Sequence, residues 1–241
     1  MTIDYHRLKD IANISQARCK CVVALLRAYF FLMKKIMFND KYGLTQAVLE
    51  GRKTQTRRLL TLTLHEGDLH EDLKEVCPDK VFRCVNRWMF EYKGKVYDIP
   101  TQNYPKYSVG EIVAVAQSYH TIYDEFGLET MDMIVAKLKY SKGWSDKRFV
   151  APNLMPHQIR ITNVRIERLQ DISREDCLAE GVEFDGNARQ FYCGFNKSTN
   201  SKIWLGSTPR EAYSTLIDRV SGNGTWHSNP FVFVYDFELV K

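Results

Sequence analysis

The segment formed by residues 45–58, TQAVLEGRKTQTRR, constrains the fold of this chain more than any other stretch. Thr45 is a residue type that begins helices and Gly51 is the type that ends them, so the first half predicts one short helix. The second half predicts a strand, in which successive side chains point to opposite faces. One face then carries Lys53, Gln55 and Arg57, and the other carries Thr54, Thr56 and Arg58.

This segment is rich in groups that bind polar ligands. Arginine binds phosphate through two parallel hydrogen bonds, while threonine and glutamine supply hydrogen bonds of defined direction. The segment therefore suits an anionic or planar polar ligand. Charged residues also protect exposed edge strands from unwanted pairing, and the charge pattern alone leaves both interpretations open.

Residues 51–58, GRKTQTRR, resemble the G-[RK]-K-T-x-T-x-R signature of the ASCH domain family. Further segments extend the resemblance to a phage and prophage subgroup of ASCH-like proteins, over about residues 36–241 with gaps. These segments are Trp144, residues 155–168, residues 169–173 with 179–182, and Trp226 with Asn229 and Pro230.

The resemblance implies an α+β fold, built on a PUA-like (ASCH) β-barrel with flanking short helices. The domain would span residues 36–241, with insertions at about 65–107 and 184–207. Members of the family are mostly regarded as RNA-associated, so the resemblance implies binding of RNA or a modified nucleotide. The binding residues would be Arg52, Lys53, Thr54, Arg57 and Arg58.

An enzymatic alternative comes from the same resemblance. One bacterial branch of the family is an amidohydrolase that removes the acetyl group of N4-acetylcytidine, and its catalytic residues match Lys53, Thr56 and Glu180. Thr56 would be the nucleophile, a neutral Lys53 its base, and Glu180 the group that relays the proton or orients the lysine. Alternatively, Lys53 and Glu180 form a structural ion pair between strand and helix. A third alternative, an accessory or morphogenetic phage protein, rests on the resembling subgroup alone.

Composition limits the function classes. A net charge of +5 and a pI near 8.8 permit an anionic partner without requiring one. The six cysteines include no C-x-x-C pair, so we expect neither a zinc site nor a disulfide framework, and we expect reduced thiols in a cytoplasm. No dinucleotide-binding glycine motif and no P-loop occurs, so no metal and no cofactor is predicted.

Residues 1–35 differ from the rest of the chain. Residues 22–33 are apolar except for Arg27, but about 12 residues are too few to cross a bilayer, and no cleavage site follows. We therefore predict no membrane partner. We interpret this stretch as an upstream extension, either a loosely packed helix or residues that precede a true initiator at Met33 or Met37.

Several downstream elements have clear local signals. Ser173 with Asp176, and Thr208 with Glu211, have the spacing of helix capping boxes. Lys93 and Gly94 predict the turn of a hairpin, and residues 231–239 alternate as a strong closing strand. Residues 184–207 interleave aromatic and basic side chains, as a stacking surface for single-stranded nucleic acid would. The alternative is a mobile loop that folds its aromatic rings onto the barrel.

Overall fold

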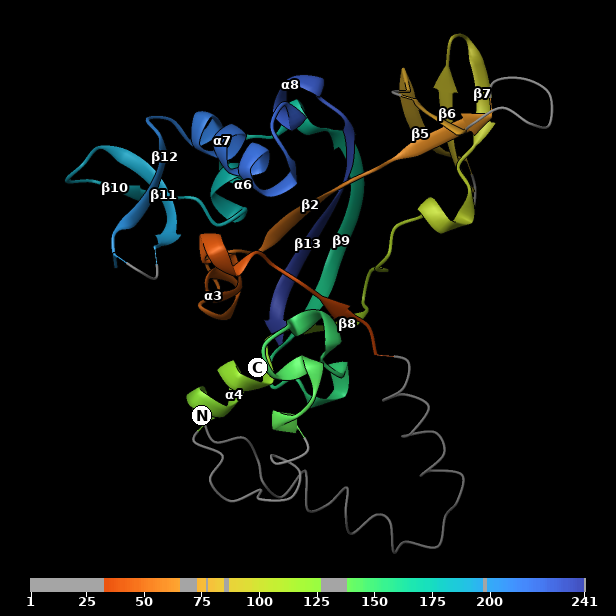
Figure 1. Cartoon of the computed structure of the whole chain (residues 1–241). Coiled ribbons are helices and arrows are strands. Elements are labelled where there is room, and N and C mark those ends of the chain that lie inside the picture. Colours follow the sequence, from red (N-terminus) through yellow and green to blue (C-terminus); the bar gives the residue numbers. More distant parts are fainter. Residues whose placement is uncertain are drawn as a thin grey trace, which may run out of the picture. The chain divides into compact units, whose positions relative to one another are not determined.

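The computed structural model describes residues 33–65, 73–76, 78–84, 87–126, 138–196 and 199–240 (Figure 1). Residues 1–32, most of the predicted extension, lie outside these ranges. The described residues divide into two compact units. One contains residues 33–38 and 112–159 with Val240, and the other contains residues 39–111 and 160–239.

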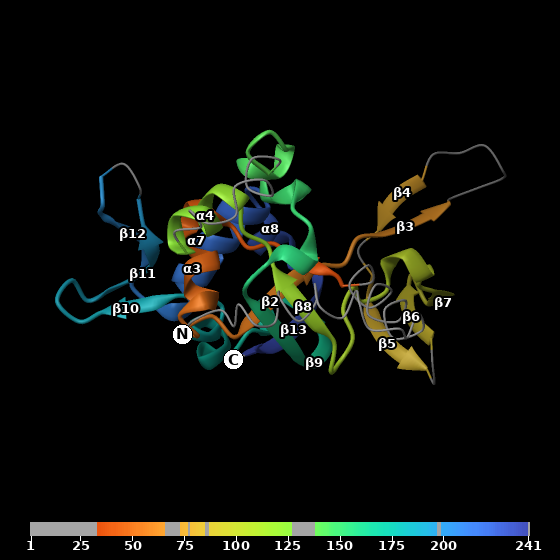
Figure 2. The same ribbon diagram turned by 90° about the horizontal axis from the view of Figure 1, so that it is seen from below.

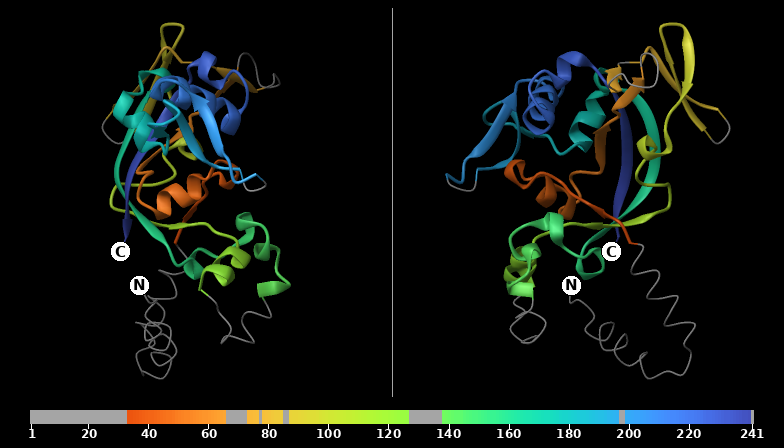
Figure 3. Two further views of the ribbon diagram at one scale, coloured as in Figure 1. Left: turned by 90° about the vertical axis from the view of Figure 1, so that its left-hand side faces the viewer. Right: turned by 45° about the vertical axis from the view of Figure 1, so that its right-hand side comes forward.

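Three strands form the central sheet of the larger unit: β2 (Gln55–Leu59), β13 (Phe231–Val240) and β9 (Gln158–Arg168), which enters this unit at Arg160. Their order is β9-β13-β2, and they run side by side in Figures 1 and 3. β13 and β2 are antiparallel, with Asp236 opposite Gln55 and Tyr235 opposite Thr56. Residues that lie opposite each other project to the same face, so this register fixes the neighbours of every signature residue.

Two helices cover one face of this sheet. α6 (Arg174–Ala179) begins at Ser173, whose side chain accepts a hydrogen bond from the Asp176 N–H, and α7 (Pro209–Ser221) begins at Thr208 in the same way with Glu211. Both predicted capping boxes are confirmed. The core between helices and sheet consists of Leu169, Ile172, Cys177, Tyr213, Ile217, Val232 and Val234, with Trp226 packed against it.

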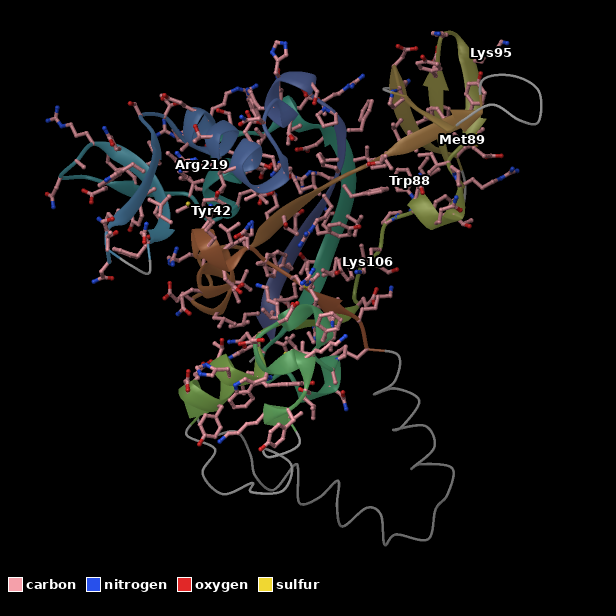
Figure 4. All side chains as sticks on the ribbon, in the orientation of Figure 1. Tyr42, Trp88, Met89, Lys95, Lys106 and Arg219 are labelled. Carbon is pink, nitrogen blue, oxygen red and sulfur yellow. The ribbon has the colours of Figure 1, made fainter. Side chains whose placement is uncertain are left out.

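Smaller sheets occupy the segments predicted as insertions. β3 (Leu62–His65) pairs with β4 (Leu73–Val76). β5 (Lys80–Cys84), β6 (Arg87–Tyr92) and β7 (Lys95–Asp98) form a three-stranded antiparallel sheet. From this sheet Trp88, labelled in Figure 4, packs edge-on against Phe233 at 6.0 Å between ring centroids. The predicted hairpin turn is confirmed, since Lys93 and Gly94 both have positive φ, 50° and 73°. β10 (Glu183–Asp185), β11 (Gln190–Phe195) and β12 (Lys202–Gly206) form a further three-stranded sheet.

The smaller unit is built from a short parallel pair and several helical turns. β1 (Lys35–Ile36) pairs with β8 (Ile112–Val115), and α4 (Tyr119–Phe126) follows. The 3-10 turns η3 (Lys142–Trp144), η4 (Lys147–Phe149) and η5 (Pro152–Leu154) complete it. Its core contains Ala114, Ala116, Tyr119, Ile122, Val150 and Met155.

The first predicted helix is present but begins two residues earlier than expected. α3 (Leu44–Leu49) starts after Gly43, which is left-handed at φ 67°, so the prediction of Thr45 as its N-cap is wrong. The reason is the preceding 3-10 turn η1 (Asp40–Tyr42), which runs almost directly into the helix and places Thr45 inside it. The Thr45 hydroxyl instead donates to Asp40 Oδ1 at 2.5 Å. Gly51 ends the helix in the left-handed region, as predicted.

The predicted mixed α+β class is confirmed. The described residues form several sheets and few helices. Their strand pairings do not show closure into a barrel. The short turns η2 (Thr101–Asn103), η6 (Leu169–Asp171) and the helix α8 (Thr225–Ser228) complete the larger unit. Within the described residues, no helix has the length and apolar character that a membrane crossing requires.

Candidate ligand-binding site around Lys53 and Glu180

Lys53 and Glu180, 127 residues apart in the chain, are in direct contact. The Lys53 ammonium donates to the Glu180 carboxylate at 2.5 Å and to the Glu180 main-chain oxygen at 2.8 Å. Local structure fixes both residues: the Thr54 N–H donates to the Ala179 oxygen at 2.9 Å, and Glu180 is the C-cap of α6. Gly181 follows at φ 95°, where a side chain would meet the Lys53 Cβ at 3.4 Å. A glycine is favoured here by the positive φ, which is strained for other residues, whereas the contact with Lys53 would itself be of ordinary length.

The ion pair is buried. The side chains of Lys53 and Glu180 are 2% and 6% exposed. Burial lowers the pKa of Lys53, because it penalises the charged ammonium; the charge of Glu180 opposes this effect, while Arg58 and Arg57 add to it. The result is a lysine that loses its proton more easily than an exposed one.

Arg57 lies next to this ion pair and contacts three carboxylates. Its guanidinium contacts Glu180 at 3.2 Å, Glu167 at 2.6 Å and Asp176 at 2.9 Å. It also donates to the side-chain oxygen of Gln55. Burial works against its charge, but Glu180 and the other acids outweigh this and raise the pKa of Arg57, so the guanidinium stays protonated.

A second, more accessible layer surrounds Arg57. Arg165 of β9 contacts Asp236 at 2.6 Å, Asp176 at 2.8 Å and Glu167 at 3.1 Å. The amide nitrogen of Gln55 joins the same layer by donating to Asp176 at 3.0 Å and to Asp236 at 2.6 Å. We call the whole set the polar cluster; its members are Lys53, Gln55, Arg57, Asn163, Arg165, Glu167, Asp176, Glu180 and Asp236.

The polar cluster has one more acid than it has cations. Lys53, Arg57 and Arg165 face four carboxylates, so the cluster carries a net charge of about −1 when all groups are ionised. Its inner part is buried, whereas the side chains of Arg165, Asp176 and Asp236 are 32%, 24% and 26% exposed. This outer edge is the part of the cluster that a ligand can reach.

Tyr213 borders the cluster from α7. Its hydroxyl is buried and has no hydrogen-bond partner among the described residues, and the Arg57 guanidinium carbon lies 5.8 Å from the centre of its ring. Burial, reinforced by the charge of Glu180, raises the pKa of Tyr213 well above the usual value. An unsatisfied buried donor is costly, so this hydroxyl offers a hydrogen bond that the described protein groups do not use.

The structure brings some predicted site residues together and separates others. Lys53, Arg57 and Glu180 converge, and the predicted alternation of β2 explains why Gln55 joins them. Thr56 projects to the opposite face of β2, toward Tyr235, because it occupies the alternate position. The predicted triad therefore has its lysine and glutamate in contact, but its threonine on the other side of the strand.

The remaining predicted ligands lie outside the cluster. Arg52 pairs with Glu50 and Glu183, and Thr54 is exposed, with its main chain bonded to Ala179 and Phe237. Arg58 is exposed and projects to the same face of β2 as Thr56.

Sequence reasoning identified Glu180 but missed the other acids of the polar cluster, Glu167, Asp176 and Asp236. Two signals were available: Arg165 and Glu167 stand two apart on one strand, and Asp236 interrupts the apolar run of β13.

Among the residues that the structure describes, no group of three or more His, Cys, Asp or Glu side chains is arranged to hold a metal ion. Comparison with protein-family models gave no match, and neither the curated proteins nor the solved structures contain a detectably similar chain.

Proposed function

We propose that this protein is an ASCH-type, PUA-like domain that binds RNA or a modified nucleotide, and that the polar cluster recognises the base. The strands β9, β13 and β2 would form part of the barrel, with α3 and α6 as its flanking short helices. The family signature supports the proposal, since its central lysine and an arginine both lie in the cluster.

The observation that carries this proposal is the pairing of Lys53 and Arg57 with carboxylates. Cations that are already neutralised, in a cluster of net negative charge, are poorly suited to phosphate. Alternating donors and acceptors instead match the edge of a nucleobase, whose amino groups donate and whose ring nitrogens and carbonyls accept. The partly exposed Arg165 and Asp236 offer both kinds of group next to each other.

Binding of single nucleosides tests the proposal. Isothermal titration with cytidine, N4-acetylcytidine and the other nucleosides is expected to give binding that falls about tenfold or more in Arg165→Met, since a good bidentate contact is worth about 1–3 kcal/mol. Arg160→Met is the matched control, because Arg160 is on the same strand but reaches Glu238 at 3.9 Å. Equal affinity in the wild type and Arg165→Met would contradict base recognition by the cluster.

A second candidate function, hydrolysis of an acylated nucleoside, is favoured by one specific observation. Lys53 is buried, bonded to Glu180 and lowered in pKa, which are the properties of a lysine that acts as a general base. Thr56 is less well placed as a nucleophile, because it lies on the opposite face of β2 from Gln55 and Arg57.

Incubation with N4-acetylcytidine, followed by chromatography of released cytidine, tests hydrolysis. Lys53→Met should abolish turnover if the protein is a hydrolase that uses Lys53 as its base. Thr56→Val separates two mechanisms: loss of turnover assigns the nucleophile to Thr56, and retained turnover assigns it to water. The absence of cytidine release by the wild type would rule this candidate out.

A further inference from the structure

The sheet β10-β11-β12 has one covered face and one open face. Phe191, Cys193 and Leu205 are buried and alternate with residues of the opposite face, so they form the covered side toward α7. The register places Tyr192 opposite both Glu183 and Trp204, which puts these three side chains together on the open side. Figure 2 shows the sheet from below, beside α7.

Three aromatic rings gather on the open side. The Tyr192 ring lies 5.9 Å from the Trp204 ring and 6.0 Å from the Phe195 ring, between centroids. Phe195 and Trp204 remain 49% and 38% exposed. The sheet therefore buries one set of apolar side chains and leaves a second, aromatic set accessible, which a folded-down loop would not do. We call Tyr192, Phe195 and Trp204 the aromatic face.

One basic side chain, Lys202, lies against the aromatic face. The Lys202 ammonium lies 4.5 Å from the centre of the Tyr192 ring and 5.8 Å from that of Trp204, and it pairs with Asp185. Arg219 of α7, labelled in Figure 4, donates to the Trp204 main-chain oxygen at 3.5 Å but belongs to the covered side of the sheet, where its charge acts on buried Cys193. Because Lys202 is already paired with Asp185, the exposed rings rather than phosphate pairing are what this face offers to a single-stranded nucleic acid, whose bases stack on aromatic side chains.

The aromatic face is linked to the polar cluster through Arg52. Tyr192 donates its hydroxyl proton to Glu183 at 3.1 Å, and Glu183 pairs with Arg52. Arg52 immediately precedes Lys53 in the chain, so the signature segment contacts both surfaces.

We propose that the aromatic face is a stacking surface for single-stranded nucleic acid, on which the bases next to the recognised nucleotide rest. This inference rests on the proposed function, and it defines the ligand as a strand rather than a free nucleoside. Stacking accepts any base, so sequence preference would come from the polar cluster and added affinity from the aromatic face.

Fluorescence anisotropy with a labelled single-stranded RNA of about 10 nucleotides tests the inference, since this length matches the site size of comparable stacking surfaces. Trp204→Ala and Phe195→Ala should each weaken binding about fivefold to 100-fold, the usual loss for one stacked base. Trp204→Phe keeps a ring and should restore most of the affinity. Tyr140→Ala is the matched control, because Tyr140 is 93% exposed and lies outside the sheet.

Nucleoside titration of the same variants separates this inference from the proposed function. Trp204→Ala should bind nucleosides as the wild type does while it loses affinity for RNA. RNA affinity that is unchanged in Trp204→Ala and Phe195→Ala, or wild-type protein that binds nucleosides but not RNA, would overturn the stacking surface and leave base recognition intact. Failure of both ligands to bind the wild type would overturn both proposals.

Discussion

The buried pair of Lys53 and Glu180 gives the sharpest prediction about stability. Lys53→Met removes the ammonium and keeps the length of the side chain, so Glu180 stays buried with Arg57 as its remaining cation at 3.2 Å. Because Lys53 and Glu180 are almost completely shielded from solvent, no large discount for screening applies. Breaking a buried ion pair from one side costs about 3–5 kcal/mol.

Urea denaturation followed by circular dichroism measures this cost. In thermal denaturation of a chain of 241 residues, the same loss corresponds to a fall in Tm of about 6–20 °C. Lys95→Met is the control, because Lys95 is exposed on β7 and surface changes usually stay within about 0.5 kcal/mol. The double variant Lys53→Met with Glu180→Gln should lose less than the sum of the two single losses, by about 0.5–3 kcal/mol.

One result would refute this reasoning. A loss below about 1 kcal/mol in Lys53→Met is the value of a solvent-exposed pair. It would mean that water reaches the lysine, and both the burial argument and the lowered pKa would then fail.

Three other predictions follow from named groups. The pKa of Lys53 is lowered on folding, so between the lowered folded value and the unfolded value of 10.5 the unfolded chain binds more protons than the folded one. The stability of the wild type relative to Lys53→Met should therefore rise as the pH increases toward 10.5. A difference between the denaturation midpoints of the two proteins that stays constant over this pH range would count against the prediction. Tyr213→Phe removes an unsatisfied buried hydroxyl and should leave stability equal or about 1 kcal/mol higher. Since the raised pKa of Tyr213 costs stability once unfolded tyrosine ionises near pH 10, this variant should also lose less stability in alkaline urea titrations; a clear destabilisation at neutral pH would show that the hydroxyl is hydrogen-bonded. Gly194→Ala places a methyl group 3.0 Å from the Tyr42 oxygen at φ 122°, so it should destabilise by about 1–3 kcal/mol in the same assay, whereas Gly186→Ala, with open space around it, should not.

Local sequence signals predicted much of the fold, because their physical causes are local. The caps Ser173 and Thr208 bond to N–H groups three residues away, and the hairpin turn at Lys93 needs only its own dihedral angles. Thr45 failed as a cap because the preceding turn, rather than a loop, leads into its helix.

The site was predicted only in part, because it depends on long-range pairing. Alternation correctly grouped Lys53 with Arg57, and the same alternation separates Thr56 from them. The contact between Gln55 and Asp236 spans 181 residues and depends on the register of β2 with β13. No local pattern encodes that register, so the sequence marked some of these acids as unusual but did not show which of them contact Arg57 and Gln55.

The double contact of Glu180 with Lys53 divides two properties between backbone and side chain. The main-chain oxygen at the end of α6 holds the ammonium whatever residue occupies position 180, whereas the carboxylate opposes the effect of burial and helps the lysine keep its proton. A replacement of Glu180 would thus change the pKa of Lys53, while the main-chain oxygen of residue 180 would still hold the ammonium in place.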